Sequence, residues 1–223
     1  MDRKHNSVAE RIHHEIRMDI LSGKFVGGSR LAESTLAKEK KVSRTWVREA
    51  LRQLVKEDLL YTIPRAGYVV KELSEQDIID LFKTRESIEV VAGQIAMKNI
   101  SDAEFKLLEN NLNKTKAAIK AGAMENMIEL DIDFHTIIYK ATRSKYLYRI
   151  CMTLSDYTRR SVIIVPKVAK HARRDHRGIY DAFKSKDPTT VKEAIRIHLK
   201  VVKEDILEHL IKIKNESFFD RMR

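Results

Sequence analysis

The stretch that decides the fold runs from residue 42 to residue 54 and reads Val42-Ser43-Arg44-Thr45-Trp46-Val47-Arg48-Glu49-Ala50-Leu51-Arg52-Gln53-Leu54. Val47, Leu51 and Leu54 recur at the spacing of one helical face, which predicts a helix with a buried side. We expect Ser43 to cap the start of this helix, because a serine hydroxyl accepts a hydrogen bond from a free backbone N–H of the first turn.

The same helix carries a row of arginines. Arg44, Arg48 and Arg52 recur at every fourth residue, so they share a face that differs from the apolar one. A helix with an anchored side and a cationic side suits insertion into the major groove of DNA, where arginine donates to guanine edges. Taken alone, the row is more typical of an ordinary amphipathic helix with a solvated basic face.

The flanking residues favour the DNA-binding interpretation. Upstream, residues 8–22 and 33–40 predict two further helices, the first with a capping box at its Ser7 start. Downstream, residues 60–63 and 68–70 are rich in β-branched and aromatic types, and the Pro-Arg-Ala-Gly between them has turn chemistry. Three helices followed by a hairpin with a basic tip make a winged helix-turn-helix.

In this arrangement we expect Arg44 and Arg48 to reach base edges and Arg52 to lie nearer a phosphate. Four further positions are expected to hold the DNA backbone, two from the recognition helix and two from the wing: Ser43, Thr45, Arg65 and Gly67.

Residues 8–70 resemble the DNA-binding domain of the GntR superfamily of bacterial transcription regulators. The resemblance is carried by short motifs spread over the domain, among them Gly28-Ser29-Arg30-Leu31, Leu36-Ala37, Val42-Ser43-Arg44-Thr45, Val47-Arg48-Glu49-Ala50-Leu51 and Gly67. It implies a winged helix-turn-helix that binds double-stranded operator DNA.

Composition is consistent with this assignment. The chain has 223 residues, of which only 7 are Gly and 3 are Pro, and its charged fraction of 34% suits a largely helical protein. The formal net charge of +11 suits a polyanionic partner. Cys151 is the only cysteine, and neither a signal peptide nor a membrane-spanning run is present, so we expect a cytoplasmic location and no membrane contact.

We place a domain boundary near Leu73, which gives a DNA-binding domain over residues 1–73 and a second domain over residues 74–223. Helices alone are predicted in the second domain, at about 75–97, 102–121, 125–142, 145–164, 168–185 and 188–214. The predicted fold class is therefore mostly α: an N-terminal winged helix-turn-helix of three helices plus a β-hairpin, followed by an all-α six-helix bundle.

Polar residues interrupt the apolar stripes of three of these helices. They are Asp131 and His135 on one helix, His176 on a second and His198 on a third. Buried polar groups need partners, and a shared divalent cation satisfies all four at once. Imidazole and carboxylate ligands suit zinc, nickel, manganese or iron. The alternative is that each histidine is a satisfied core residue or lies at an exposed edge.

Residues from about 75 to 212 resemble the FCD domain, the helical effector domain of the FadR branch of the same superfamily. The matches include Asp131-Ile132-Asp133-Phe134-His135, His176 and His198. This resemblance implies a metal site that binds small carboxylates. Arg85, on an otherwise apolar stripe, matches a family arginine near the effector pocket; a salt bridge with a carboxylate such as Asp131 is the alternative.

Together these observations predict a homodimeric, ligand-responsive regulator, and the resemblance favours a repressor over an activator. Two rivals stay open. One is a metal-dependent enzyme acting on a small organic acid, although neither a paired acid and base nor a nucleophile motif is evident, so we expect no enzymatic activity. The other is a regulator whose bundle is a metal-free dimerisation module.

Overall fold

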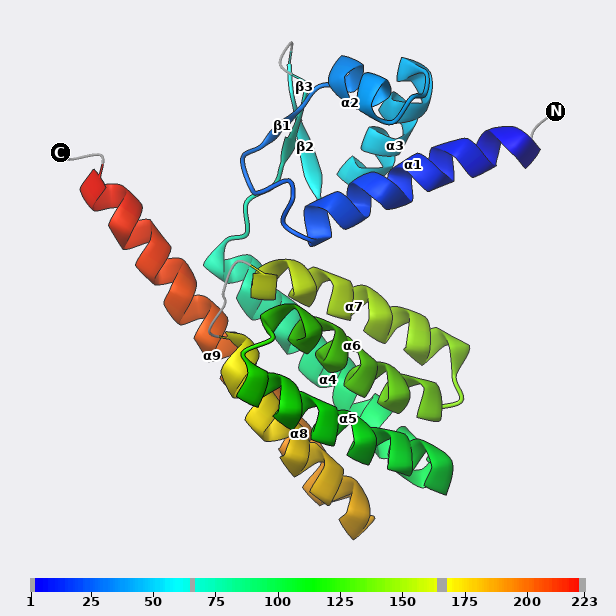
Figure 1. The fold of residues 1–223 in the computed structure, drawn as a ribbon, viewed down its shortest axis with the longest axis vertical. Coiled ribbons are helices and arrows are strands. Elements are labelled where there is room, and N and C mark those ends of the chain that lie inside the picture. The colour runs from blue at the N-terminus through cyan, green and yellow to red at the C-terminus, as the bar shows by residue number, and fades with distance from the viewer. Residues whose placement is uncertain (1–2, 65–66, 164–167, 221–223) are drawn as a thin grey trace. The chain divides into compact units, whose positions relative to one another are not determined.

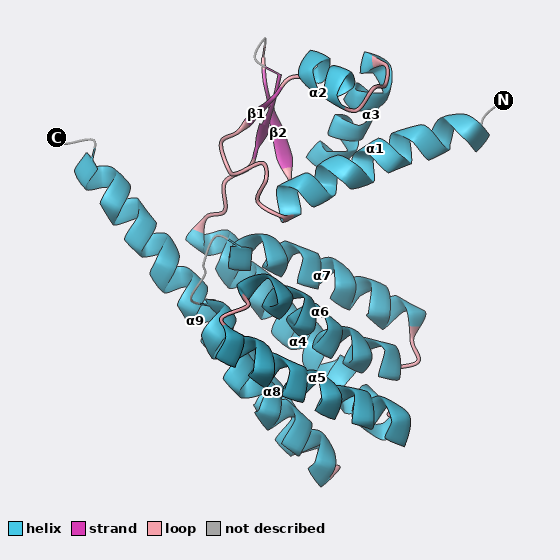
Figure 2. Cartoon of the chain, in the orientation of Figure 1, coloured by secondary structure: helices cyan, strands magenta, loops and turns pink. Residues whose placement is uncertain are grey.

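The computed structural model describes residues 3–64, 67–163 and 168–220. The chain divides into two compact units, Met1–Ser74 and Glu75–Arg223. Among the described residues, strands occur only in the first unit, and the second unit is built from helices (Figures 1 and 2). The predicted fold class, a winged helix-turn-helix followed by an all-helical bundle, is confirmed.

The described residues of the first unit form, in order, α1 (Arg3–Leu21), β1 (Arg30–Leu31), α2 (Glu33–Glu39), α3 (Arg44–Lys56), β2 (Leu60–Ile63) and β3 (Gly67–Val70). Helix α1 begins at Arg3, ahead of the start predicted at Ser7. The predicted hairpin of β2 and β3 gains a third strand, because β1 pairs antiparallel with β3 and places Leu31 opposite Tyr68. Strand β3 is therefore central, in the order β1-β3-β2.

Helix α3 is anchored by its apolar face. Val47, Leu51 and Leu54 are fully buried and α3 packs against α1. The predicted N-cap bond is wrong: Ser43 occupies the N-cap position with an extended backbone, but its side chain makes no capping hydrogen bond. Ser43 is exposed, so water is available to the free N–H groups of the first turn.

The second unit comprises α4 (Glu75–Asn99), α5 (Asp102–Ala121), α6 (Met124–Ala141), α7 (Lys145–Ile163), α8 (Val168–Ser185) and α9 (Pro188–Asp220). The capping box at the start of α5 is present, since the backbone N–H of Glu104 donates to Ser101 and that of Ser101 donates to the Glu104 carboxylate. Asp187 caps α9 by accepting from the backbone N–H groups of Thr189 and Thr190.

Helix α4 is the centre of the helical unit, because it packs against α6, α7 and α9. Its approach to α9 depends on Gly93. A Cβ atom built on Gly93 would lie 2.2 Å from Cδ1 of the buried Ile195, whereas one built on Gly178 of α8 would have no atom within 4 Å. A methyl group at position 93 would therefore displace the end of the Ile195 side chain in the α4–α9 contact.

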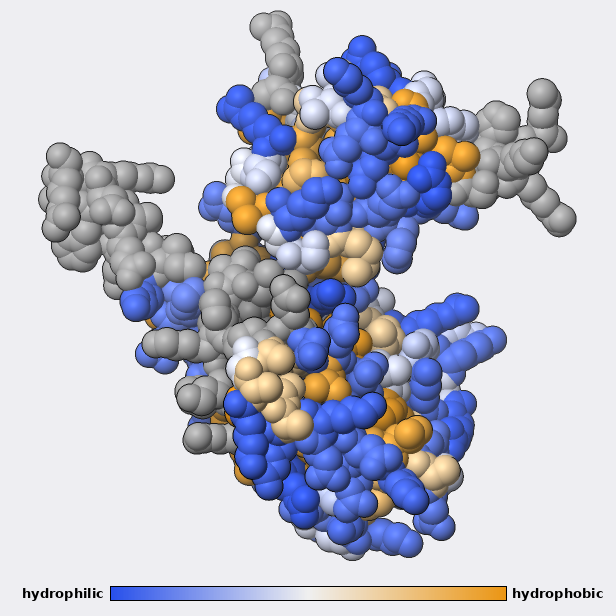
Figure 3. Space-filling view, in the orientation of Figure 1, coloured by the Kyte–Doolittle hydropathy of each residue, from blue (hydrophilic) through white to orange (hydrophobic). Residues whose placement is uncertain are grey.

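In the view of Figure 3, most of the described residues at the surface are hydrophilic, and hydrophobic residues show between them. Within the part of the chain that the structure describes, no helix is both long enough and apolar enough to cross a membrane.

The two glycines provide a matched test of the α4–α9 packing. Both substitutions, Gly93→Ala and Gly178→Ala, add the same methyl group to a helix and gain the same helix propensity. Only Gly93→Ala overpacks the core, so its free energy of unfolding should be lower than that of Gly178→Ala by about 1–3 kcal/mol. Equal stability of the two variants in urea denaturation would show that α9 approaches α4 less closely than described.

Candidate functional site

Three histidines from three different helices meet in the interior of the helical unit. His135 lies on α6, His176 on α8 and His198 on α9, and their exposed fractions are 6%, 1% and 2%. One ring nitrogen of each lies within 4.8 Å of those of the other two. The Nε2 atoms of His135 and His176 are 3.2 Å apart.

This geometry is compatible with two arrangements. Two nitrogens that each lie about 2.0–2.1 Å from one ion are about 3 Å apart in tetrahedral or octahedral coordination, so the Nε2–Nε2 distance suits a shared metal. The same distance also suits a hydrogen bond in which one neutral imidazole donates to the other. Burial lowers the pKa of His135 well below its usual value, and His176 and His198 lower it further. A neutral imidazole retains the lone pair that either arrangement needs.

Aromatic neighbours restrict how the rings turn. The ring of Phe134 stacks on that of His176 with a centroid distance of 4.2 Å and an angle of 9° between the planes. The ring of Tyr139 stacks on that of His135, with a centroid distance of 5.8 Å. These contacts favour a fixed orientation of the imidazoles, as a preorganised ligand set requires.

Asp131 lies at the edge of the histidine cluster. Its Oδ1 atom is 3.4 Å from Nε2 of His176, and its side chain is 38% exposed. Asp131 is therefore close enough to complete the predicted set of four ligands. It differs from the histidines because solvent reaches its carboxylate.

Arg85 of α4 is buried, and its partner is Glu89 one turn further along the same helix. The Nε atom of Arg85 donates to Oε1 of Glu89 at 2.5 Å, and each side chain is only 4% exposed. This ion pair replaces the suggested pairing with Asp131 as the main partner of Arg85. Burial lowers the pKa of Arg85, but the electrostatic interactions with Glu89, Tyr139 and Asp131 and the hydrogen bond to Glu89 together outweigh it, so the net shift is upward.

Arg85 interacts electrostatically with the groups of the histidine cluster. The charge of Arg85 contributes to the low pKa of His135, and the charge of Asp131 contributes to the high pKa of Arg85. Burial and the charge of Glu89 also raise the pKa of Cys151 to about 12, so its thiol stays protonated at neutral pH. The interior of the unit thus combines neutral nitrogen donors with a fixed guanidinium.

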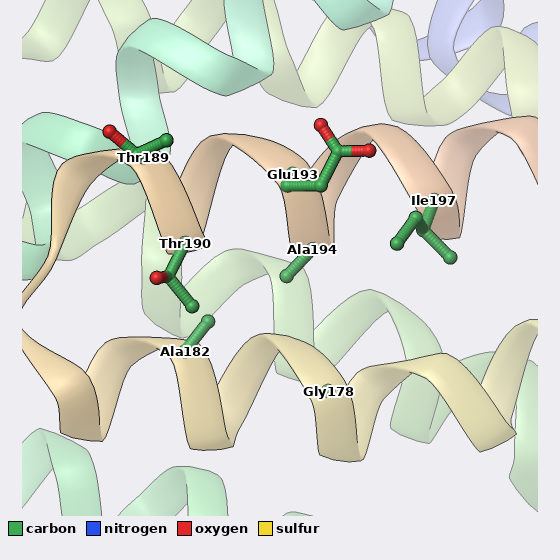
Figure 4. A pocket seen from close by; sticks show the side chains of 7 residues that line it. All are labelled: Gly178, Ala182, Thr189, Thr190, Glu193, Ala194 and Ile197. Atoms are coloured by element: carbon green, nitrogen blue, oxygen red, sulfur yellow. The ribbon is translucent and has the colours of Figure 1, made fainter.

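A separate groove of about 510 Å³ lies between α8 and α9, lined by Gly178, Ala182, Thr189, Thr190, Glu193, Ala194 and Ile197 (Figure 4). Among the described residues that line it, Glu193 is the only ionisable one, and its carboxylate repels anions. The charge of this groove therefore disfavours an anionic ligand.

The arginine row of the first unit faces solvent, as a DNA-reading surface requires. The side chains of Arg44 and Arg48 are 66% and 46% exposed, and Arg52 is exposed one turn further along α3. Ser43, Thr45 and Gly67 are also exposed, whereas Arg65 lies outside the described residues.

Glu33, the first residue of α2, contacts two of these arginines. Its Oε1 and Oε2 atoms accept from Nε and Nη2 of Arg48, both at 2.8 Å, and Oε2 is 3.7 Å from Nη2 of Arg44. Sequence reasoning had assigned no such role to Glu33, because its partners lie 11 and 15 positions later in the chain. Glu89 did carry a signal, since it follows Arg85 at the i,i+4 spacing of a helical ion pair.

Comparison with known families decides the identity of the two units. The profile of the bacterial regulatory proteins, gntR family, matches residues 8–70, and that of the FCD domain matches residues 80–201. The chain belongs to the GntR family. It is thus a DNA-binding transcription regulator with an FCD domain.

Individual GntR-family proteins resemble it over most of their length. The uncharacterized HTH-type transcriptional regulator YdhC of Bacillus subtilis is 28% identical over 84% of this chain and 86% of its own. The gluconate operon transcriptional repressor of B. subtilis is 28% identical over 90% and 85%. A solved putative GntR regulator from Rhodococcus sp. RHA1 shares the fold, with a TM-score of 0.74 and 20% identity over 91% of this chain and 98% of its own.

Proposed function

We propose that this GntR-family regulator is a homodimeric repressor whose FCD domain binds a divalent metal ion and a small carboxylate effector. The observation that supports the proposal is the convergence of three buried imidazole nitrogens within 4.8 Å of one another. Buried imidazoles brought together from three helices are a typical donor set for a transition metal.

His135, His176 and His198 would hold the ion, and Asp131 at the edge of the cluster would supply an oxygen ligand. Such an ion is a Lewis acid that attracts carboxylate oxygens. Arg85, which donates to Glu89 through Nε, has further N–H groups that suit the second oxygen or the far end of an acid. The residues present therefore fit a metal-dependent site for a small acid.

The charges of this site favour one class of acid. Arg85 and Glu89 form a buried pair with no net charge, and Asp131 cancels one of the two positive charges of a divalent ion. One positive charge remains, and a buried net charge is costly unless a counter-ion meets it. A monocarboxylate neutralises the site, whereas a dicarboxylate leaves it negative. Gluconate is a first candidate, because one relative is the repressor of a gluconate operon.

In the DNA-binding unit, we assign base readout to Arg44 and Arg48 and phosphate contact to Arg52. Ser43, Thr45, Arg65 and Gly67 would hold the DNA backbone. Helix-turn-helix regulators read two half-sites as symmetric dimers, so two chains are expected on one roughly palindromic operator.

A metal-free bundle is the second candidate, and a specific contact favours it. The 3.2 Å separation of the His135 and His176 nitrogens is also that of a direct hydrogen bond. In that case the histidines would be structural, and the FCD domain would serve dimerisation alone.

Metal analysis distinguishes these candidates. Purified protein should carry about one divalent ion per chain, and His198→Gln should lose it together with the stabilisation that the ion provides. His209→Gln is a matched control, since His209 lies on the same helix outside the cluster. Mass spectrometry of the metal content and thermal unfolding with and without a chelator measure both effects. A wild-type protein whose unfolding temperature responds to neither chelator nor added metal would support the metal-free bundle.

The charge argument predicts which acid is the effector. Gluconate should bind more tightly than glucarate, which has the same carbon chain and a second carboxylate. The double variant Arg85→Met, Glu89→Leu removes the ion pair without leaving a buried charge, so it should keep metal and lose effector affinity. In calorimetric titrations, operator DNA should change the affinity for the effector by the same factor by which the effector changes the affinity for operator DNA. Tighter binding of glucarate than of gluconate would contradict the charge balance.

The recognition-helix assignment predicts two kinds of DNA-binding defect. Arg44→Ala and Arg48→Ala should each lose about 1–3 kcal/mol of operator affinity and relax specificity, because each removes a base contact. Arg52→Ala should weaken binding to operator and scrambled DNA alike. Lys56→Ala, which removes a charge from the far end of α3, serves as the control in fluorescence anisotropy titrations. Wild-type operator affinity in an Arg44→Ala, Arg48→Ala double variant would rule out this use of α3.

A further inference from the structure

The carboxylate of Glu33 lies behind the guanidinium groups of the recognition helix. The Glu33 side chain is only 18% exposed, whereas those of Arg48 and Arg44 project into solvent. Two parallel hydrogen bonds at 2.8 Å join Glu33 to Arg48, which is the bidentate geometry that fixes both the position and the plane of a guanidinium. The hydrogen bonds from Arg48 lower the pKa of Glu33, which is therefore ionised at neutral pH.

The atoms used in this pair determine which edge of Arg48 stays available. A guanidinium has five N–H groups, and Glu33 takes those of Nε and one of Nη2. The remaining edge, formed by Nη1 and the second N–H of Nη2, still presents two parallel donors. Two parallel donors match the O6 and N7 acceptors of guanine in the major groove.

We propose that Glu33 is a positioning residue for operator recognition. It holds the edge of Arg48 formed by Nε and Nη2, so that the edge formed by Nη1 and Nη2 faces the bases. This inference rests on the assignment of α3 as the recognition helix. An arginine that is already oriented loses less side-chain freedom when it meets DNA, so more of its hydrogen-bond energy appears as affinity for the correct base.

Glu33 also limits binding to incorrect sequences. Arg44 and Arg48 carry two positive charges within reach of one carboxylate, which cancels one of them. Without Glu33 both arginines would be free to turn toward phosphates, which are present in every DNA sequence. Glu33 is therefore expected to raise the ratio of specific to non-specific affinity and not affinity in general.

A purely structural role for Glu33 predicts a different result. An acidic residue in the first turn of α2 interacts favourably with the helix dipole, and the ion pair between Glu33 and Arg48 joins α2 to α3. If this were its whole contribution, Glu33→Gln would lower stability and weaken binding to all DNA by the same factor.

The experiment uses the full-length protein and two duplexes. One is an operator fragment selected by the wild-type protein from a random library, and the other has the same bases in scrambled order. Glu33→Gln should lower the affinity ratio between them about tenfold, within the range for one bidentate base contact. On the scrambled duplex its affinity should be equal or higher, with a salt dependence steeper by about one phosphate contact.

Glu49→Gln is the matched control. Glu49 is exposed on α3, so this substitution removes the same charge from the DNA-facing unit, and no contact of Glu49 with Arg44 or Arg48 is among those described. It should raise non-specific affinity without changing the ratio. An equal fall of the ratio in both variants would show that net charge alone is responsible, which would overturn the positioning role.

A double-mutant cycle tests whether Glu33 acts through Arg48. In an Arg48→Ala background, Glu33→Gln should have a much smaller effect on the affinity ratio, because only the longer contact between Glu33 and Arg44 is left to lose. An undiminished effect there would overturn the proposal, and so would a single variant that keeps the wild-type ratio. If Arg44→Ala and Arg48→Ala themselves leave the affinity ratio unchanged, the assignment of α3 as the recognition helix is contradicted, whatever Glu33→Gln does. Thermal unfolding of each variant separates loss of specificity from loss of fold, and Glu33→Asp retains the charge if Glu33→Gln unfolds.

Discussion

Polar side chains buried among apolar helices must find partners, and the helical unit is organised around how they do so. His135, His176 and His198 come from three helices, and the Arg85–Glu89 pair lies on a fourth. Each of these polar groups is costly to bury without a partner. The position of each helix is therefore restricted by the need to keep its polar groups next to their partners. A ligand that bound here would act on α4, α6, α8 and α9 together, which is the type of site from which a small molecule can shift a conformational equilibrium.

The DNA-binding unit satisfies its charges in the opposite way. Its core is apolar, and its polar contacts are exposed or half-buried; in one of them, Glu33 holds Arg48 while leaving donors free. An arginine with all its donors satisfied by protein could not read DNA, and one without a partner would be attracted to any phosphate. An arginine that gives some of its N–H groups to a protein carboxylate and keeps the others free is therefore compatible with selective DNA binding.

Helix α4 connects the DNA-binding unit to the buried polar groups of the helical unit along the chain. Only residues 71–74 separate it from the central wing strand β3, and the same helix carries Arg85. Coupling between an effector and DNA requires an element whose equilibrium both ligands bias. The direct covalent path from wing to Arg85 makes α4 the first candidate for that element.

Local pattern was enough to predict most of the fold. The apolar spacing of Val47, Leu51 and Leu54 predicted the helix that forms α3, and the capping box at Ser101 and the Asp187-Pro188 pair are local signals for the starts of α5 and α9. These signals are readable because they depend on residues within one or two turns of each other. Strand β1 was missed, because two residues are too few to show a period of two and its existence depends on pairing with β3.

For the candidate sites, the sequence by itself determined which residue types interrupt the apolar stripes and which arginines share a face. It could not determine the partners. Arg85 pairs with Glu89 more closely than with the suggested Asp131, and Arg48 pairs with Glu33 across the turn between two helices. The convergence of His135, His176 and His198 likewise depends on how three helices pack. Distances between groups far apart in the chain are decided by the packing of the core as a whole, so only the tertiary structure could place these side chains together.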